Sequence, residues 1–232
     1  MHRKIFISDI HGCLDTFNEL LKQLALKEED HLFLLGDYID RGPHSKGVID
    51  RIIELKKANF KLTTLRGNHE QGLIYDYISE TVKGWKDMAE EAMKRSFGIE
   101  RLEQLPKPYF EFFNELPIFH QEDDFIAVHA GLNFRYENPF QSEEDLMWIR
   151  DWYKNIDYNW LGERVIIHGH TPQTIQEIEK QLGELDEKRV IDIDAGAFLS
   201  QQKGNGLGHL CAFDWTNKQL YFQENVEKDN KY

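Results

Sequence analysis

The sequence predicts an α/β protein built around a parallel β-sheet. Three stretches in its N-terminal part each join a short apolar run to a polar loop and then to apolar residues at helical spacing. Alternation of strand and helix is typical of parallel strands joined by right-handed crossovers. Each loop follows its strand directly, and the carboxyl ends of parallel strands share one edge of a sheet. We therefore expect the three loops to lie side by side and to form one site.

Length and composition indicate a single folded domain. The chain has 232 residues, of which 41% are apolar and 30% are charged, as is ordinary for a globular protein with a sizeable core. We expect one domain over residues 1–226, in which residues 71–116 form a helical cap beside the site. Residues 227–232 are expected to be a disordered tail.

The net charge of −13 limits the partners that the protein can have. An acidic chain disfavours nucleic-acid polymers and anionic membranes, and an anionic substrate would need local positive charge. No apolar run approaches the roughly 20 residues that span a bilayer, and the N-terminus lacks the apolar core of a signal peptide. Two distant cysteines, Cys13 and Cys211, indicate no disulfide framework. We expect a cytoplasmic protein.

The first polar loop, SDIHG at residues 8–12, follows an apolar strand over 4–8 and precedes a helix beginning near Leu14. Alternate residues of an extended chain point the same way, so Asp9 and His11 can converge on one ion. A carboxylate with an imidazole suits manganese, iron, zinc or cobalt. Taken alone, such a triplet is a weak signal, and chance occurrence is the default interpretation.

The second loop, GDYIDRG at residues 36–42, follows an apolar strand over 31–35. It carries two carboxylates and a guanidinium, and Asp37 lies just past the strand, where a metal ligand is expected. Its glycines allow the tight path that brings backbone atoms close to an ion or a phosphate. In isolation the same pattern is also that of a solvated turn.

The third loop, RGNHE at residues 66–70, follows a strand over 60–65. The Asn68 carbonyl could bind a metal ion, and His69 could act as an acid or a base. Alternatively, Asn68 caps a helix whose positive end attracts Glu70. Ligand-type residues in three successive loops favour the metal site over this alternative.

The second half of the chain adds further histidines after apolar strands. Two strands are expected between residues 117 and 129, the second ending at His129, and a strand over 164–167 ends in HGHT at residues 168–171. Either His168 or His170 could bind metal. An amphipathic helix over 142–153 delivers Trp148 and Arg150, and residues 189–193, 210–213 and 219–222 are expected to form antiparallel strands.

Five loops, taken in chain order, resemble those of the calcineurin-like metallophosphoesterases. They are DIHG at 9–12, GDYIDRG at 36–42, GNHE at 67–70, HAG at 129–131 and GHT at 169–171. More narrowly, they look like the phosphoprotein phosphatase branch and, within it, the bacterial and bacteriophage-lambda type of serine/threonine protein phosphatase. Ser8 stands where a glycine is usual in the first loop, a departure that affects the turn rather than a ligand.

The resemblance implies a four-layer α/β/β/α sandwich, in which two mixed β-sheets are flanked by helices. It also implies a pair of divalent metal ions. The first ion would be held by Asp9, His11 and Asp37. The second would be held by Asp37, Asn68, His129 and His170. By the same resemblance His69 would be the catalytic acid, oriented by Asp40. The phosphate would be held by Arg41, Arg66 and Arg150.

Two adjacent metal ions suit the hydrolysis of a phosphoester. They clamp the attacking and departing oxygens of an in-line displacement and acidify a bound water, so a metal-bridging hydroxide is the expected nucleophile. No phosphoenzyme is then required. Mixed oxygen and imidazole ligands favour manganese, with iron, zinc, cobalt and nickel as alternatives. An alkoxide leaving group needs a proton, which His69 is expected to supply.

Three functions are open from the sequence. The first is a metal-dependent serine/threonine protein phosphatase that acts on phosphoproteins or phosphorylated small molecules, with phosphotyrosine as a further substrate. The alternative is a nucleotide hydrolase of the symmetrical diadenosine tetraphosphatase kind, which shares the scaffold. The third is a catalytically inactive binding scaffold. Such scaffolds usually lack the acid histidine or a ligand, and this sequence retains them all. We therefore expect an active protein phosphatase.

Overall fold

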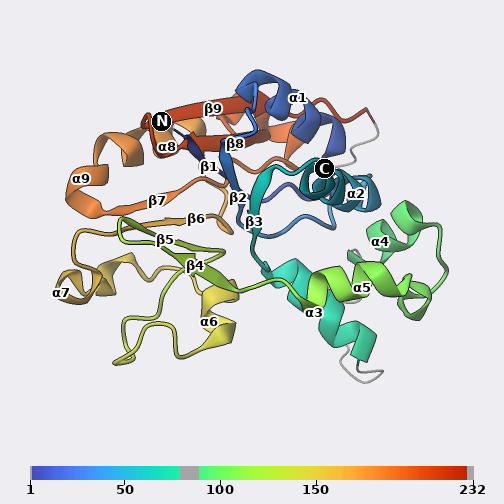
Figure 1. The fold of residues 1–232 in the computed structure, drawn as a ribbon, viewed down its shortest axis with the longest axis horizontal. Helices are drawn as coiled ribbons and strands as arrows, with labels where there is room; N and C mark the ends of the chain where they lie inside the picture. Colours follow the sequence, from blue (N-terminus) through green and yellow to red (C-terminus); the bar gives the residue numbers. More distant parts are fainter. Residues whose placement is uncertain (1, 79–88, 229–232) are drawn as a thin grey trace.

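The protein is a sandwich of two β-sheets with helices on both outer faces (Figure 1). The computed structural model describes residues 2–78 and 89–228. Its four layers confirm the α/β/β/α arrangement expected from the sequence. In the described ranges, no helix combines the length and hydropathy that a bilayer crossing requires.

The first sheet has five strands in the order β3-β2-β1-β8-β9. Its strands are β1 (Lys4–Ile7), β2 (His31–Leu34), β3 (Lys61–Thr64), β8 (His209–Asp214) and β9 (Gln219–Glu224). The first three are parallel, with Ile5 opposite Leu32 and Leu32 opposite Leu62, and β8 joins β1 antiparallel. The three N-terminal loops therefore leave the same edge of this sheet, as predicted.

The second sheet has four strands in the order β4-β5-β6-β7. They are β4 (Phe119–Gln121), β5 (Phe125–Val128), β6 (Val165–His168) and β7 (Val190–Asp192). Strands β5, β6 and β7 are parallel. The expectation that residues 189–193 join an antiparallel set was wrong, because two helices between β6 and β7 carry the chain back to the start of the sheet.

Twelve helical segments surround the sheets in the described ranges. Beside the first sheet lie α1 (Leu14–Leu24), α2 (Ser45–Lys57), α3 (Asn68–Ile78), α4 (Ala89–Phe97) and α5 (Lys107–Asn114), with the short η1 (Leu102–Gln104). The other α-helices are α6 (Glu143–Trp148), α7 (Tyr158–Leu161), α8 (Ile175–Gly183) and α9 (Leu185–Lys188). Two short 3-10 helices, η2 (Tyr153–Asn155) and η3 (Ser200–Asn205), complete the set.

The period-two alternation of the strands builds the layers. In β1, Ile5 and Ile7 face the helices, whereas Phe6 faces the second sheet, and all three side chains are buried. The Phe6 ring stacks on Phe33 at 4.6 Å and meets Phe125 of the second sheet edge-on at 5.0 Å. One aromatic cluster thereby fastens the two sheets together.

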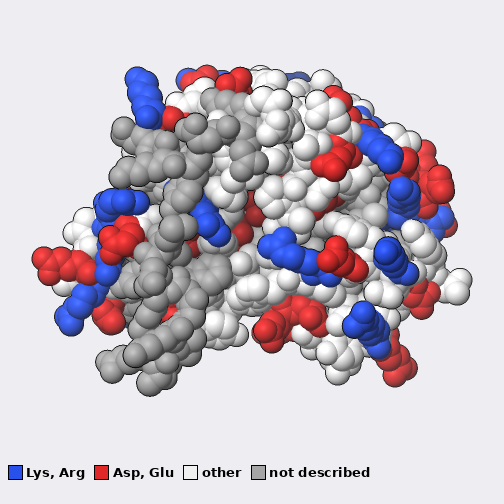
Figure 2. All heavy atoms as spheres, turned by 180° about the vertical axis from the view of Figure 1, so that it is seen from behind, with Lys and Arg blue, Asp and Glu red and all other residues white. Residues whose placement is uncertain are grey.

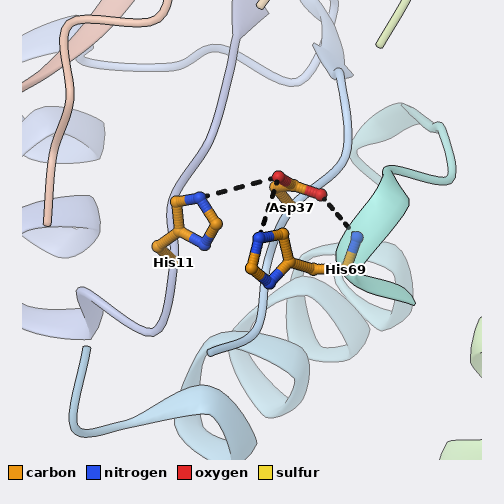
Figure 3. Close-up of side chains that lie close together, drawn as sticks. All are labelled: His11, Asp37 and His69. Atoms are coloured by element: carbon orange, nitrogen blue, oxygen red, sulfur yellow. Dashed lines mark hydrogen bonds and ion pairs between the residues drawn. The ribbon is translucent and has the colours of Figure 1, made fainter. Parts of the chain in front are cut away.

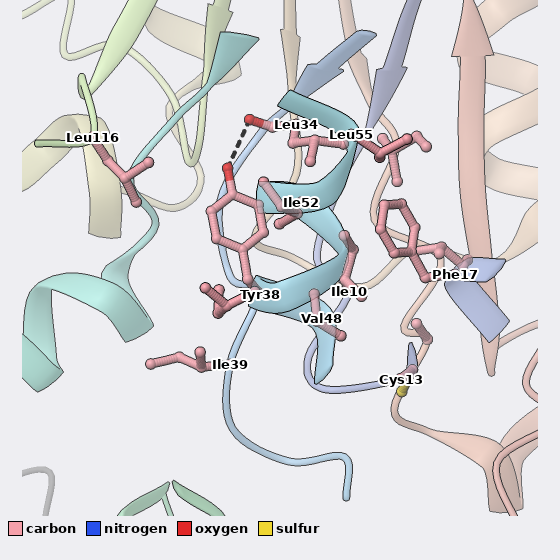
Figure 4. Close-up of a cluster of buried hydrophobic side chains, with 14 of the residues drawn as sticks. Ile10, Cys13, Phe17, Leu34, Tyr38, Ile39, Val48, Ile52, Leu55 and Leu116 are labelled. Carbon is pink, nitrogen blue, oxygen red and sulfur yellow. Dashed lines mark hydrogen bonds between the residues drawn. The ribbon is translucent and has the colours of Figure 1, made fainter. Parts of the chain in front are cut away.

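The core between the first sheet and its helices supports the second polar loop (Figure 4). Tyr38 lies in that loop, and its hydroxyl oxygen lies 2.6 Å from the carbonyl oxygen of Leu65 and 3.0 Å from that of Leu34, so that its one proton is shared between two acceptors. Its ring is fully buried beside Val48 and Ile52 of α2. The apolar core thus fixes the backbone on both sides of Asp37.

Residues 71–116 contain the helices expected there, and those described pack on one another and on α2. Tyr109 donates to the Asp50 carboxylate at 2.6 Å, and the Lys46 amide donates to the Ser96 hydroxyl at 2.8 Å. Part of the expected cap, residues 79–88, lies outside the described residues.

Two boundaries differ from the prediction. The helix expected over 142–153 ends at Trp148, because Ile149 is extended with ψ near 140° and Asp151 has a φ of 56°. Glu227, placed in the disordered tail, is buried and accepts from the Thr16 amide at 2.9 Å. It is held there because the first turn of α1 has an unpaired N–H group that Cys13 does not cap.

Charges of both signs are interspersed on the face seen from behind (Figure 2). Many form short surface pairs, such as Lys22 with Glu19 and Lys188 with Glu184, each at 2.6 Å. Exposed pairs of this kind add little to stability. Other charged groups are buried, among them Asp9, Asp37 and Asp40 of the polar loops.

Candidate active site

The polar loops that follow β1, β2, β3 and β6 meet around a cavity of about 250 Å³. The cavity is lined by His11, Asp37, Arg41, Asn68, His69, Trp148, Arg150, His170, Pro172, Asp194 and Phe198. Segments up to 187 positions apart in the chain, from His11 to Phe198, are therefore neighbours. The strand-edge argument predicted such a convergence for the three N-terminal loops. In the described ranges, no residue between 71 and 116 lines this cavity, so the helices of that segment lie beside the site rather than over it.

Asp37 is the centre of the first group of converging atoms (Figure 3). Its Oδ2 lies 3.6 Å from His11 Nε2 and 3.8 Å from His69 Nε2, and its Oδ1 accepts from the His69 amide at 3.0 Å. The Ile39 carbonyl accepts from His11 Nδ1 at 2.9 Å, so His11 Nε2 presents a lone pair to Asp37.

A second group joins Asp37 to His129, His170 and Asn68. The carbonyl of Leu35 can only accept, so His129 Nδ1, 3.0 Å away, carries the proton and His129 Nε2 presents a lone pair. That lone pair lies 2.9 Å from Asn68 Oδ1 and 3.5 Å from Asp37 Oδ2, both of which are also acceptors. Electron pairs that converge without a proton between them fit a divalent cation.

His170 strengthens this fit. Its Nδ1 lies 3.2 Å from His129 Nε2 and 3.0 Å from Asn68 Oδ1. Its Nε2 is buried and has no hydrogen-bond partner in the described part of the chain. His168, the alternative ligand, instead lies 3.2 Å from the Tyr153 hydroxyl through its Nε2, and among the described residues it belongs to neither group of converging atoms.

Asp9 is buried and joins the first polar loop to the loop that carries His170. Its Oδ2 accepts from the His170 amide at 3.0 Å and from the Ser8 hydroxyl. A Cβ at Gly169 would lie 2.1 Å from this oxygen, so only glycine permits the close approach. Among the described side chains, Asp9 is outside the two tight histidine–aspartate groups.

Two further predicted residues form a hydrogen-bonded pair. His69 Nδ1 lies 2.7 Å from Asp40 Oδ2, and both residues are buried. Burial lowers the pKa of His69, but the charge of Asp37 and the hydrogen bond to Asp40 outweigh it, so that the pKa is raised above the usual value. His69 can therefore hold a proton on Nε2 near neutral pH.

The three predicted arginines differ in position. Arg41 lines the cavity, with its guanidinium 5.3 Å from the Phe198 ring. Arg150 also lines it and donates to the Thr171 hydroxyl at 2.6 Å. Arg66 instead donates to Gln71 at 2.8 Å and to the Asn114 carbonyl at 2.6 Å, and it is not among the described residues that line the cavity.

Backbone strain is concentrated in the same loops. A positive φ is uncommon for residues other than glycine and costs on the order of 1–3 kcal/mol each. Values between 44° and 78° occur at six predicted site residues, Asp9, His11, Asp37, Asp40, Arg41 and His170. Such a conformation persists only where surrounding contacts hold it, as they do here.

Glu70 supplies one of those contacts, and sequence reasoning gave it no role in the site. It is fully buried and accepts from the amides of Asp37 at 2.9 Å, Tyr38 at 2.8 Å and Gly67 at 2.9 Å. One carboxylate thus ties the second loop to the third. Its position directly after Asn68 and His69, at the start of a helix, was the available signal.

Four other cavity-lining residues were also missed as site residues, namely Trp148, Pro172, Asp194 and Phe198. Asp194 follows β7 by two positions, so it obeys the same rule as the predicted ligands. That signal was lost because β7 was expected in the wrong arrangement.

Burial favours the neutral form of three histidines and opposes ionisation of two carboxyls. Burial lowers the pKa of His11, His129 and His170 to about 3. Burial, with the charge of Asp37, raises the pKa of Asp194 to about 7. Burial and then the charges of Asp194 and Asp37 raise the pKa of Asp9 well above its usual value. A compact cluster of acids beside neutral imidazoles again fits bound cations.

A family model described as calcineurin-like phosphoesterase matches residues 2–204. The chain belongs to this family. Membership agrees with the five loops from which the resemblance was drawn. Placement closer to the bacterial protein phosphatases than to other branches stays a prediction.

Curated relatives of this phosphoesterase carry nucleotide-hydrolase names. The symmetrical bis(5′-nucleosyl)-tetraphosphatase of Nitrosomonas europaea is 31% identical over 127 residues, covering 54% of this chain and 43% of the relative. The asymmetrical bis(5′-nucleosyl)-tetraphosphatase PrpE of Anoxybacillus flavithermus is 26% identical over 203 residues, covering 72% and 77%. The chain thus matches less than half of the first relative's length.

Solved structures share the fold of this phosphoesterase. A proposed diadenosine tetraphosphatase has a TM-score of 0.67 at 19% identity and covers 95% of this chain and 92% of its own. A serine/threonine phosphatase from Saccharomyces cerevisiae with similarity to human PP5 has a TM-score of 0.66 at 15% identity and covers 99% and 82%. At these identities the likeness concerns the fold alone.

Proposed function

We propose that this phosphoesterase is a divalent-metal-dependent hydrolase of nucleoside polyphosphates such as bis(5′-nucleosyl) tetraphosphates. The observation that carries the hydrolase activity is the convergence of lone pairs around Asp37 in a cavity that also holds two arginines. The nucleotide preference is supported by the names of the curated relatives, symmetrical and asymmetrical alike. It replaces the protein phosphatase that the sequence motifs favoured.

Metal binding is assigned to the residues that converge on Asp37. His11 and Asp9 would serve one ion, and Asn68, His129 and His170 the other, with Asp37 shared. When bound, divalent ions activate water for attack and stabilise the charge that develops on phosphate. Manganese suits this donor set best, with iron, zinc, cobalt and nickel as alternatives.

Arg41 and Arg150 are the proposed phosphate-binding side chains. Both line the cavity, and the planar guanidinium can bond two phosphate oxygens at once. The Thr171 hydroxyl and the His170 carbonyl hold one Arg150 nitrogen, at 2.6 Å and 3.2 Å, and thereby orient it. Arg66 would need to leave its partners Gln71 and Asn114 to take part.

His69 is the proposed proton donor. Its Nδ1 is engaged by Asp40, so the proton available to a leaving oxygen is the one on Nε2. That atom lies 3.8 Å from Asp37 Oδ2 and therefore beside the proposed metal ligands. A positioned acid of this kind contributes about 10²–10⁴-fold to the rate.

A phosphoprotein phosphatase is the second candidate, and the same pair favours it. An alkoxide leaves poorly without a proton, whereas a phosphate leaving group of a polyphosphate is far less basic. A histidine held at 2.7 Å by a buried carboxylate is therefore of most use to a monoesterase. The two candidates are separable by substrate.

The test compares two substrates at equal concentration with manganese present. Faster cleavage of diadenosine tetraphosphate than of a phosphoserine peptide supports the nucleotide hydrolase, and the reverse order supports the phosphatase. Chromatography of the products distinguishes symmetrical from asymmetrical cleavage. Asp37→Asn, which removes the negative charge and one oxygen of the shared ligand, should abolish both reactions, whereas exposed Glu29→Ala should affect neither.

A further inference from the structure

Among the tryptophans that the structure describes, Trp148 is the one whose ring has no hydrogen-bonding or stacking partner. Trp152 stacks on Tyr153, Trp160 lies under Arg164, and Trp215 donates to Asp124. The Trp148 ring has no hydrogen bond, ring contact or cation–π contact with the described residues, and it belongs to none of their apolar clusters. It is half-buried and lines the cavity.

The fold presents Trp148 to the cavity. It is the last residue of α6, and the preceding residues Leu146 and Met147 are buried in the protein. Ser142 starts this helix by accepting from the Asp145 amide at 3.1 Å, which fixes the direction of the short element. The Trp148 ring is thus held at the rim by the buried residues before it.

Trp148 lies close to where a phosphate would bind. Only Ile149 lies between it and Arg150 in the chain, so the Cα atoms of Trp148 and Arg150 are at most about 7 Å apart. Arg150 is itself fastened to Thr171 and to the carbonyl of His170. A phosphate between Arg150 and the proposed metal ligands therefore places the next part of the substrate beside the indole.

The cavity is too small to enclose a nucleoside as well as the reacting phosphate. Its volume of about 250 Å³ is below the 300–1,000 Å³ usual for pockets that bury a whole drug-sized ligand. The group attached to the phosphate must lie at the rim, where Trp148 is half-exposed. A flat aromatic group gains most from such a surface, because stacking needs only one face of the ring.

We infer that Trp148 stacks on a nucleobase of the substrate at the rim of the cavity. The inference rests on the proposed nucleotide hydrolase and gives it a base-binding subsite. Stacking on an aromatic side chain is tolerant of base identity and is worth about tenfold in affinity. Adenine and guanine nucleotides are therefore bound with similar affinity, and a ligand without a base is bound more weakly.

The test measures binding rather than turnover. Calorimetry with the manganese-loaded protein compares AMP with ribose 5-phosphate, which differ only by the base. Wild type is expected to prefer AMP about tenfold. Trp148→Ala should bring the two affinities together, and Trp148→Phe should keep most of the preference. Tyr136→Ala, which changes a 41% exposed aromatic residue outside the cavity lining, is the matched control and should keep it fully.

Two results would overturn the inference. One is equal affinity of wild type for AMP and ribose 5-phosphate. The other is a Trp148→Ala variant that loses affinity for both ligands in the same proportion, which would assign the side chain to the shape of the site. Failure of the proposed function looks different, because the wild-type protein would then leave diadenosine tetraphosphate intact while releasing phosphate from a phosphoserine peptide.

Discussion

At the scale of single residues, the pair formed by His69 and Asp40 shows how environment sets chemistry. Both side chains are buried, and burial alone would leave His69 neutral. The carboxylate of Asp40 at 2.7 Å and the charge of Asp37 reverse that effect. The pKa of His69 is thereby raised, which favours the protonated imidazole that the proposed proton donor needs.

The variant His69→Asn tests the role of this side chain. Its ring would be lost, but the ligand atoms around Asn68, His129 and His170 would remain. We expect metal binding to be retained and turnover of substrates with basic leaving groups to fall about 10²–10⁴-fold. Steady-state kinetics on an alkyl phosphate and on p-nitrophenyl phosphate provide the comparison. An equal loss on both substrates would remove His69 from the role of acid.

Asp40→Asn tests the electrostatic part of the same pair. Because the hydrogen bond and charge of Asp40 raise the pKa of His69, their removal should lower it. The acid form is then lost at a lower pH, so the alkaline limb of the kcat profile should move toward acid. An alkaline limb that stays in place would show that another group controls it.

At the scale of elements, the C-terminal segment holds the start of α1. Glu227 Oε1 accepts from the Thr16 amide at 2.9 Å and from its hydroxyl at 3.1 Å, and the Val226 amide donates back to that hydroxyl at 3.1 Å. Cys13, at the N-cap position, makes no side-chain cap. A residue from the far end of the chain therefore caps the helix that follows the first metal loop.

Glu227→Ala should destabilise the protein by about 1 kcal/mol, the usual cost of losing a helix cap. Urea denaturation of the metal-free protein measures this loss, with the exposed substitution Glu29→Ala as control. The same denaturation midpoint for Glu227→Ala and wild type would show that water replaces the cap without cost.

The elements that could be predicted share one signal. A short apolar run followed at once by ligand-type side chains located β1, β2, β3, β5 and β6 together with most of the site. Strand β7 has only three residues, and nothing in them specifies its neighbour. Helix α8 does carry a local sequence signal, because Thr174 and Glu177 have the spacing of a capping box. In the structure the Thr174 hydroxyl accepts from the Glu177 amide at 3.3 Å, and the Thr174 amide donates to the Glu177 carboxylate at 2.8 Å.

Side-chain direction could not be predicted in the same way. Arg66 sits in the expected loop, yet its guanidinium turns toward Gln71 and Asn114 because two oxygen acceptors lie there. Glu70 is adjacent to the predicted ligands, but its three amide donors come from two different loops. Contacts of this kind depend on tertiary packing, which no local pattern records.

At the scale of the whole molecule, the loops around Asp37 join both sheets. His11 follows a strand of the first sheet, whereas His129 and His170 follow strands of the second. An ion held by all of them would link the two sheets directly. Metal binding should therefore stabilise the entire fold and not only the loops.

The melting temperature is expected to be higher with manganese than in a metal-free sample that contains a chelator. A ligand that binds only the folded state stabilises it by about 2.7 kcal/mol at 100 times its dissociation constant. Calorimetric scans with and without manganese measure the shift, and Asp37→Asn should abolish most of it. A wild-type melting temperature indifferent to manganese would contradict the proposed metal ligands.

The pH dependence of this stabilisation follows from the buried acids. Burial, with the charge of Asp37, raises the pKa of Asp194 to about 7, and burial raises that of Asp9 well above normal. Between the unfolded value near 4 and the folded value, the metal-free folded state holds protons that the unfolded state has released. Its stability therefore falls as pH rises through this window.

A bound cation favours the ionised acids, so metal binding releases those protons. The histidine ligands release almost none above pH 5, because their pKa values are already lowered to about 3. The manganese-induced rise in melting temperature should accordingly grow from pH 5 to pH 7 and then level off. Titration calorimetry in buffers of different ionisation enthalpy counts the protons released. In Asp194→Asn the manganese-induced rise in melting temperature should depend less on pH. If this variant kept the full pH dependence, the released protons would come from other groups.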